Sequence, residues 1–214
     1  MINSLILKQE QLSETPVILQ CGDFRTLIKK VPDNSIDLIL TDPSYSKRFL
    51  PLWENLAAES RRVLKPSGFL ITYSGQLYLP QIMNTLSKQL RYYWLGTLYH
   101  KGRIERRFEV NMFNKGKLIL FYQKEPYKKQ SNWLEDVLYN KEPNGKFHRW
   151  GQDIQPFKLL IEKFTNIGDT VLDPLAGGGT VIEAVVSLKR NAIGFEINEK
   201  AYKQIKRRLK NLHN

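Results

Sequence analysis

Short apolar runs alternate along the chain with longer segments of helical periodicity, and this alternation limits the fold more than any other feature. The expected strands span residues 17–21, 36–41, 69–74, 92–99, 117–123, 170–174 and 192–197. The expected helices span residues 24–30, 51–64, 76–90, 154–165, 180–189 and 198–211. This order is typical of an α/β protein whose mostly parallel sheet carries helices on both faces. The fifth strand follows the fourth without a helix between them, so we expect these two strands to form an antiparallel hairpin.

Length and composition fit one globular domain. The chain has 214 residues, of which 42% are hydrophobic and 25% charged, and it is long enough to bury a core. We expect a single domain over residues 1–214, with an excursion at about 98–150 whose second half, 124–150, reads as a loop or small insertion. No apolar run approaches the ~18 residues that span a bilayer, and residues 1–11 lack the features of a signal peptide. These observations predict a cytoplasmic protein without membrane contact.

Cys21 is the single cysteine of the sequence. One cysteine excludes a disulfide framework and any multi-cysteine metal site, and it suits a reducing compartment. Cys21 ends the first expected strand, so we expect it to be buried and without chemistry. We expect no bound metal.

The chain is strongly basic, and its charge is concentrated in two stretches. It has 33 Lys and Arg against 21 Asp and Glu, for a formal net charge of +12. Residues 98–150 carry twelve basic and six acidic side chains, and residues 198–214 carry six and one. Such patches favour a polyanionic partner, most often nucleic acid. A merely soluble basic protein is the alternative at this point.

The sharpest local signal is a glycine-rich loop between an expected strand and an expected helix. Three consecutive glycines let a backbone approach a ligand and present N–H groups at the start of a helix. Glu196 ends the next strand, 23 residues after Asp173, where an acidic side chain binds ribose hydroxyls in doubly wound sheets. No Gly-Lys-Ser/Thr closes the loop, so it favours nucleoside binding over triphosphate hydrolysis; the alternative is a turn that needs glycine only for packing. The loop comprises Asp173, Pro174, Leu175, Ala176, Gly177, Gly178, Gly179 and Thr180.

A second motif, Asp42-Pro43-Ser44-Tyr45, directly follows the strand that ends at Thr41. A carboxylate, a proline-fixed turn and an aromatic ring at the carboxyl end of a strand suit a planar amine. The Asp42 carboxylate and a turn carbonyl accept the two amine protons, while the Tyr45 ring stacks on the base. Holding the protons in this way directs the nitrogen lone pair at an electrophile. Taken alone, the motif is better explained as an ordinary β-turn.

Together the two motifs resemble those of S-adenosylmethionine-dependent DNA amino-methyltransferases, which methylate adenine N6 or cytosine N4. The family's D-P-P-Y box matches Asp42 to Tyr45, and its D-P-F-x-G-S-G-T box matches Asp173 to Thr180. The catalytic box precedes the cofactor box, as in the permuted β-type group. The resemblance covers about residues 17–210 and implies a seven-stranded Rossmann-like methyltransferase sheet. Further segments similar to that group are Cys21-Gly22-Asp23, Ser35-Ile36-Asp37-Leu38, Arg62 to Gly68 and His148 to Asp153.

The resemblance also implies roles. Asp42 and the Pro43 carbonyl would bind the target amine, and Tyr45 would stack on a base flipped out of the duplex. Asp173 and the glycine loop would hold the methionine part of S-adenosylmethionine, Glu196 its ribose and Asp23 its adenine amino group. Ser44 departs from the second proline of the box, which removes a φ restraint and adds a hydroxyl. The remaining residues implied in cofactor binding are Thr41, His148, Gln152 and Ile197.

The best candidate for a nucleic-acid surface lies between the hairpin strands. Four basic side chains alternate there with apolar and aromatic ones, a pattern that suits phosphate contacts and base stacking; a solvated hairpin tip is the equal alternative. The basic run 206–210 is better explained as a solvated helix face. The expected nucleic-acid contacts are Lys101, Arg103, Arg106 and Arg107, extended by Lys128, Lys129 and Arg149.

These features predict an S-adenosylmethionine-dependent DNA methyltransferase that acts on adenine N6 in a short site of double-stranded DNA. Asp42 at the head of the box favours adenine, because cytosine N4 enzymes more often begin it with Ser or Thr. A homodimer and a cognate restriction enzyme are candidate partners. The alternatives are a cytosine N4 enzyme, an RNA base amino-methyltransferase and an inactive DNA-binding relative.

Overall fold

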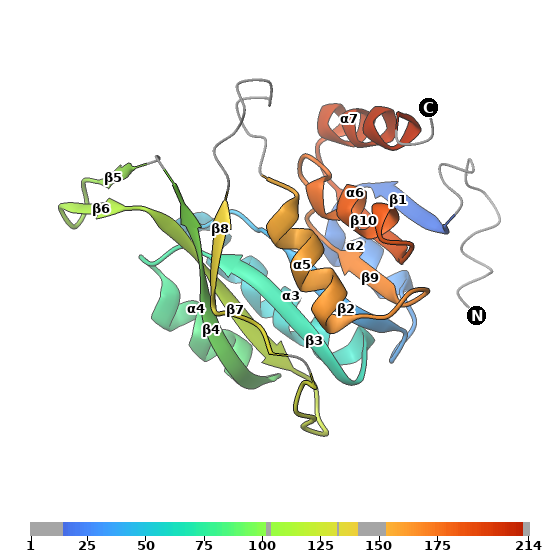
Figure 1. Ribbon diagram of the computed structural model, residues 1–214, viewed down its shortest axis with the longest axis horizontal. Coiled ribbons are helices and arrows are strands. Elements are labelled where there is room, and N and C mark those ends of the chain that lie inside the picture. The colour runs from blue at the N-terminus through green and yellow to red at the C-terminus, as the bar shows by residue number, and fades with distance from the viewer. Residues whose placement is uncertain (1–14, 102–103, 132, 141–152, 212–214) are drawn as a thin grey trace.

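We describe the fold from a computed structural model, in which residues 15–101, 104–131, 133–140 and 153–211 are placed (Figure 1). These residues form a main sheet of eight strands. From one edge to the other, the strands are β1 (Val17–Cys21), β10 (Asn191–Glu196), β9 (Thr170–Asp173), β2 (Ile36–Thr41), β3 (Leu64–Ser74), β7 (Gly116–Gln123), β4 (Arg91–His100) and β8 (Val137–Asn140).

The strands from β1 to β3 in this order run parallel, and the direction changes at β7. β7 runs antiparallel to both β3 and β4, whereas β8 runs parallel to β4. The α/β class and the β4–β7 hairpin predicted from the sequence are therefore confirmed. The main sheet has one strand more than predicted, because β8 lies in the segment expected to be a loop. Its four residues are too few to show a period, and pairing with β4 is what makes them a strand.

The helices form a layer on each face of the sheet (Figure 1). No helix among the described residues is long and apolar enough to cross a membrane. One layer consists of α2 (Phe24–Leu27), the short helix η1 (Ile28–Lys30), α3 (Leu50–Val63) and α4 (Leu79–Ser87). The other layer consists of α5 (Gln155–Phe164), α6 (Thr180–Ser187) and α7 (Glu199–Lys210). A further short helix, η2 (Lys47–Phe49), precedes α3.

Neighbouring residues of the central strands enter two separate hydrophobic clusters. In β2, Leu38 and Leu40 pack in the cluster that contains α5, α6 and α7. Ile36 and Ile39 pack in the cluster that contains α3 and α4. All four side chains are fully buried, which is why apolar residues stand side by side from Leu38 to Leu40 instead of alternating with polar ones. With both faces covered, polar side chains of the central strands gather at the strand ends.

Cys21 is exposed, so the expectation that it is buried is wrong. It is the last residue of β1, which, among the strands that the structure describes, forms one edge of the sheet and pairs with β10 alone. The first three residues of β1 are buried and the last two are not. An apolar run predicts a strand, but it does not show where along the strand the neighbouring helices stop covering it.

A second sheet of two strands extends the β4–β7 hairpin (Figure 1). β5 (Glu105–Arg107) pairs antiparallel with β6 (Met112–Asn114); residues 104–114 are called the arm below. The Nε2 of Gln76, in the loop after β3, donates to Asn114 Oδ1 at 3.1 Å and to the Gly116 carbonyl at 3.0 Å. These bonds fix the base of the arm beside the carboxyl end of β3.

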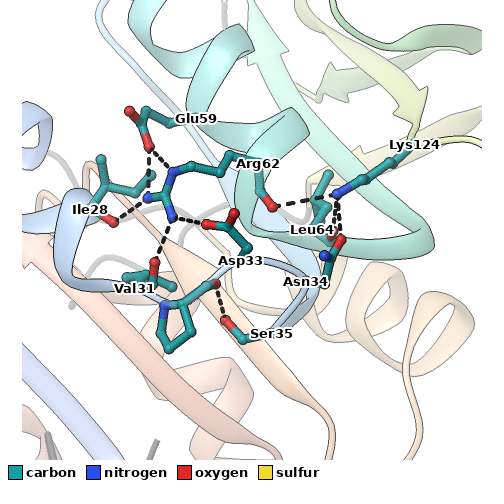
Figure 2. Close-up of polar contacts among 10 residues, drawn as sticks. Ile28, Val31, Asp33, Asn34, Ser35, Glu59, Arg62, Leu64 and Lys124 are labelled. Carbon is teal, nitrogen blue, oxygen red and sulfur yellow. Dashed lines mark hydrogen bonds and ion pairs between the residues drawn. The ribbon is translucent and has the colours of Figure 1, made fainter. Parts of the chain in front are cut away.

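Arg62, near the end of α3, joins this helix to the segment between β1 and β2 (Figure 2). Its guanidinium donates to the carbonyl oxygens of Ile28 and Val31, both at 2.7 Å. It also forms ion pairs with Asp33 at 2.6 Å and Glu59 at 2.7 Å. Arg62 therefore has a structural role, although its segment belongs to the family resemblance.

Lys124, just after β7, completes this network from the other side (Figure 2). Its Nζ donates to Asn34 Oδ1 and to the Leu64 carbonyl, both at 2.7 Å. The turn before β2 and the start of β3 are thus held together at the edge of the sheet where the parallel strands begin. The carboxyl ends of the strands, at the opposite edge, take no part in this network.

We predict that Arg62→Ala lowers the free energy of unfolding by about 2–3 kcal/mol, because it leaves two carbonyl oxygens and two carboxylates without their shared partner. Arg61→Ala is the matched control, since the Arg61 guanidinium is bonded to a single exposed carbonyl, that of Gln89, and we expect it to cost less than about 1 kcal/mol. Urea unfolding followed by tryptophan fluorescence measures both. Equal losses in the two variants would contradict the structural role of Arg62.

Candidate active site

The predicted site residues gather at one edge of the sheet, where its parallel strands end. β2 ends at Thr41, β9 at Asp173 and β10 at Glu196. Gly22 and Asp23 directly follow β1, and the Gly22 N–H donates to the Glu196 carbonyl at 2.9 Å. Ligands of open α/β sheets bind outside the carboxyl ends of the strands, so this edge is the candidate site.

A buried hydrogen bond connects the two motifs. Thr41 Oγ1 donates to Asp173 Oδ1 at 2.8 Å, and the Leu175 N–H donates to the same oxygen at 3.1 Å. Asp173 is only 2% exposed. Burial raises the pKa of Asp173 to about 7; the two hydrogen bonds oppose this increase, and the nearby charges of Asp42 and Glu196 add to it. A carboxyl group with this pKa ionises readily when a cation binds beside it.

The glycine loop is attached to the end of β10. The Gly177 N–H donates to Glu196 Oε2 at 2.7 Å, and the Asn198 N–H donates to Glu196 Oε1 at 2.7 Å. Gly179 has φ +81°, and a Cβ there would lie 2.8 Å from Ile205, so this position requires glycine. Glu196 therefore holds the glycine loop to the end of β10.

The loop is open on its outer side. Gly177 and Gly178 are exposed, and a Cβ built on either meets no atom closer than 3.8 Å. Arg208 of α7 donates to the Gly178 carbonyl at 2.6 Å and forms an ion pair with Glu183. Sequence reasoning treated the run 206–210 as a solvated helix face and missed this contact, which depends on how α7 packs. The open backbone leaves room for a ligand against the loop.

The other predicted cofactor residues differ in their surroundings. Asp23 caps α2 and pairs with Arg25, which holds the pKa of the Asp23 carboxyl below its usual range. Ile197 is 67% exposed, whereas Pro174 is buried. His148 and Gln152 lie outside the described residues.

The Asp42–Tyr45 turn presents its carboxylate and ring at the same edge. The Tyr45 hydroxyl donates to Asp42 Oδ1. Burial, and next the charge of Asp42, raise the pKa of Tyr45 well above its usual range. Pro43 is buried and Ser44 exposed. Gly75 lets the Tyr45 ring approach, since a Cβ at position 75 would lie 3.2 Å from the Tyr45 Cβ.

Two further residues, Lys117 and Tyr73, lie beside this turn and were not identified from the sequence. Lys117 Nζ lies 2.6 Å from Asp42 Oδ2, and 5.5 Å and 6.0 Å from the ring centroids of Tyr45 and Tyr73. Tyr73 is fully buried, and its hydroxyl has no hydrogen-bond partner among the described residues. A hairpin prediction places Lys117 beside β4, but only the pairing of β7 with β3 brings it to Asp42.

The expected nucleic-acid contacts divide into two groups. Lys101, which precedes the arm, and Arg106, in β5 of the arm, are exposed, and Arg107 pairs with Glu105 at 2.8 Å. Lys128 and Lys129 lie at the opposite edge of the sheet, because they follow the far end of β7, about 20 Å from its first residues. The expectation that they extend the arm surface is therefore wrong. Arg103 and Arg149 lie outside the described residues.

Apolar side chains are unusually exposed on the arm, which carries two arginines and two glutamates and is preceded by Lys101 and followed by Lys115. The side chains concerned are Ile104 at 54%, Phe108 at 78%, Val110 at 52%, Met112 at 63% and Phe113 at 66%.

Among the described residues, no group of three or more His, Cys, Asp or Glu side chains is arranged to hold a metal ion.

The glycine loop and the Asp42–Tyr45 turn lie next to each other at the carboxyl ends of the strands, as the family resemblance of their sequences implies. A family model described as DNA methylase, covering N6 and N4 enzymes, matches residues 36–207. The chain therefore belongs to this family of DNA amino-methyltransferases, and the family resemblance of the two sequence motifs is confirmed.

Individual relatives agree with this assignment. Type II methyltransferase M.HpaI of Haemophilus parainfluenzae is 26% identical over 89% of this chain and 73% of its own. DNA adenine methyltransferase YhdJ of Escherichia coli is 26% identical over 88% of this chain and 81% of its own.

Solved structures share the fold. The complex of M1.HpyAVI with S-adenosylmethionine matches with a TM-score of 0.76 at 22% identity, covering 90% of this chain and 98% of that one. The cytosine-N4-specific PvuII DNA methyltransferase matches with a TM-score of 0.76 at 15% identity, covering 93% and 94%. The first structure contains the cofactor that the sequence predicts for this chain.

The raised pKa of Asp173 predicts a pH-dependent stability. Between pH 3.8 and about 7 the folded protein holds a proton on Asp173 that the unfolded chain releases. The contribution of Asp173 to the free energy of unfolding therefore falls as pH rises through this window and is constant above it.

Asp173→Asn removes this titration. We expect the stability of Asp173→Asn relative to wild type to increase from pH 5 to about pH 7 and then to level off, with Glu162→Gln on the exposed side of α5 as control. Urea unfolding at a series of pH values measures it. A difference that does not change with pH would show that Asp173 is ionised in the free protein.

Proposed function

We propose that this chain transfers the methyl group of S-adenosylmethionine to the N6 amine of adenine in double-stranded DNA. The observation that carries the proposal is the bond from Thr41 to Asp173. Asp173 begins the glycine loop, and Thr41 directly precedes Asp42 in the chain. The bond therefore places Asp42, whose carboxylate we propose to hold the target amine, next to a residue that contacts the loop. A methyl donor on the loop and an amine on Asp42 are thereby neighbours.

The residues at this edge fit the cofactor. Its methionine part carries an ammonium group, which suits the carboxyl of Asp173, and the ribose hydroxyls suit the Glu196 carboxylate. The open backbone at Gly177 and Gly178 leaves room for the part of the cofactor between its ammonium group and its ribose. The Asp23 carboxylate would accept a hydrogen bond from the adenine amino group of the cofactor, in addition to the bonds that it accepts from Arg25. When bound, the cofactor supplies an electrophilic methyl group on a sulfonium, whose C–S bond breaks as the C–N bond forms.

The turn performs the other half of the chemistry. Asp42 and the Pro43 carbonyl accept the two protons of the amine, which directs the nitrogen lone pair away from the ring, and Tyr45 stacks on the base. The nitrogen becomes positively charged as it gains the methyl group. The Asp42 carboxylate, whose side chain is 15% exposed, stabilises this charge until the amine releases a proton to the carboxylate or to water. The amine must leave its base pair, so the base is flipped out of the duplex.

Adenine is the target we favour over cytosine. The box begins with Asp, and one relative that is 26% identical over 88% of this chain is named a DNA adenine methyltransferase. Cytosine N4 transfer is the second candidate, because the cytosine-N4-specific PvuII enzyme has the same fold and its amine would meet the same carboxylate.

Duplex DNA is the macromolecular partner that we propose for the arm. Lys101 and Arg106 supply positive charge for phosphates, and the exposed Phe108 and Phe113 supply apolar contact with bases. The bonds from Gln76 connect the arm to the loop that supports Tyr45. Cellular DNA as substrate implies a cytoplasmic protein, and a second subunit would enlarge a small recognition surface.

Asp42→Ala should abolish methyl transfer and leave the dissociation constant for S-adenosylmethionine within about threefold, since Asp42 touches the amine and not the loop. The purified proteins are incubated with the cofactor and unmethylated duplex DNA, and the digested nucleosides are identified by mass spectrometry. Glu162→Ala is the control.

Each outcome of this experiment is informative. N6-methyladenine from wild type supports the proposal, and N4-methylcytosine would keep the mechanism but correct the base. Methylation of RNA alone would replace the substrate, and no product on either nucleic acid would leave a DNA-binding relative without activity. Loss of cofactor binding in Asp42→Ala would contradict the division of roles.

Replacing Lys101 and Arg106 together by Glu should weaken DNA binding and reduce the slope of log K against log salt by about 2, one for each lost phosphate contact. Lys128→Glu with Lys129→Glu makes the same change of charge at the opposite edge of the sheet and should leave the slope nearly unchanged. Fluorescence anisotropy at several salt concentrations measures both. A larger effect of the control pair would move the DNA surface to that edge.

A further inference from the structure

Lys117 forms a close ion pair with the carboxylate proposed to hold the target amine. Its Nζ lies 2.6 Å from Asp42 Oδ2, with side-chain exposures of 23% for Lys117 and 15% for Asp42. The same ammonium lies 5.5 Å from the centroid of the Tyr45 ring, on which the flipped base would stack. A nitrogen donor on Asp42 beside the Tyr45 ring is also the arrangement that a bound target amine requires.

We propose that Lys117 is a positioning residue that occupies the place of the target amine on Asp42 and gives it up when the base enters. This inference rests on the function proposed above. The amine of the base and the ammonium of Lys117 are both nitrogen donors that approach one carboxylate from the side of one aromatic ring. Binding of the base is then an exchange of one donor for another on Asp42.

The charge that develops during transfer requires the exchange. As the amine nitrogen gains the methyl group it becomes positive, and Asp42 stabilises it. If the Lys117 ammonium were still bonded to Asp42, it would repel the positive charge on the amine nitrogen. It would also neutralise the Asp42 carboxylate, which is the group that stabilises that charge. Lys117 must therefore leave the carboxylate before transfer, although its ion pair is favourable in the free protein.

The exchange also favours bases that carry an amine. Asp42 is largely removed from solvent, so taking the donor away from its Oδ2 costs free energy, although the Tyr45 hydroxyl still donates to its Oδ1. An adenine or cytosine amine replaces the donor that Lys117 withdraws. The carbonyl oxygen at the corresponding position of thymine is an acceptor, which cannot replace Lys117 on a carboxylate. Lys117 therefore competes with the base for Asp42, and a base without an amine cannot displace Lys117.

The kinetic test compares Lys117→Met with two other variants on unmethylated duplex DNA. Lys117→Met removes the competitor and keeps the apolar stem, so we expect the KM for DNA to fall about threefold or more, with kcat equal to or above wild type. Lys117→Arg retains a donor on Asp42 and should keep KM at or above the wild-type value. Lys115→Met, an exposed lysine two residues away, corrects for the loss of one positive charge facing DNA.

These comparisons separate positioning from a structural role. If Lys117 served stability alone, Lys117→Met would lower the melting temperature, Lys117→Arg would restore it, and KM would follow that of Lys115→Met. A tenfold fall of kcat in Lys117→Met would show that the ammonium assists transfer. Either result would overturn the proposal.

A second measurement tests the ion pair without any DNA. Reductive methylation with formaldehyde and a borane, followed by peptide mass spectrometry, reports how readily each lysine reacts. We expect Lys117 to react at least several-fold more slowly than Lys115 in wild type and at a rate similar to Lys115 in Asp42→Asn. Equal reactivity in wild type would overturn the inference even if the enzyme methylates DNA. Protection of Lys117 in a wild type without activity on any nucleic acid would refute the proposed function and leave the pair a structural contact.

Discussion

The hydrogen bond from Thr41 to Asp173 joins two segments that are 132 residues apart in the chain, because β2 and β9 are neighbours in the sheet. A buried carboxyl group is costly unless it is bonded, and here a hydroxyl from one strand and the Leu175 N–H from the following loop bond the same oxygen. The position of the glycine loop and the position of the Asp42 turn are thus fixed by one another. A small shift between β2 and β9 would separate the groups that we propose to hold the methyl donor from those that we propose to hold the amine.

Charge is arranged in opposite ways at the site and around it. The strand ends carry carboxylates, among them Asp42, Asp173 and Glu196, although the whole chain has a formal net charge of +12. Acidic groups suit a cofactor with ammonium and sulfonium charges and an amine that becomes positive during transfer, whereas they repel phosphates. In the proposed function, Lys101 and Arg106 would attract the DNA backbone beside the site instead. Under the proposed function, this separation would let one edge of the molecule bind a polyanion and still present carboxylates to the base.

The sequence predicted the sheet class, the hairpin and most residues at the strand ends, since apolar runs followed by polar motifs are local signals. Cys21, Lys128 and β8 were predicted wrongly, because exposure at a sheet edge, position along a hairpin and the pairing of a four-residue strand are properties of the assembled sheet. Arg208 was missed for the same reason: its contact with the Gly178 carbonyl depends on how α7 packs over the loop. The roles of the site residues rest on the motifs, to which the structure adds their mutual distances.

One topological feature explains why Lys117 and the arm lie next to Asp42. β7 runs antiparallel to β3, with Leu118 paired to Ser74 at the last residue of β3. A strand parallel to β3 would begin at the opposite edge, where the parallel strands start. Because β7 is reversed, its first residues lie where β2 and β3 end, and the arm that precedes it projects from the same edge (Figure 1). The reversed strand therefore brings both Lys117 and the arm that we propose to contact DNA to the carboxyl ends of the strands, which a fully parallel sheet would have left to its βα loops alone.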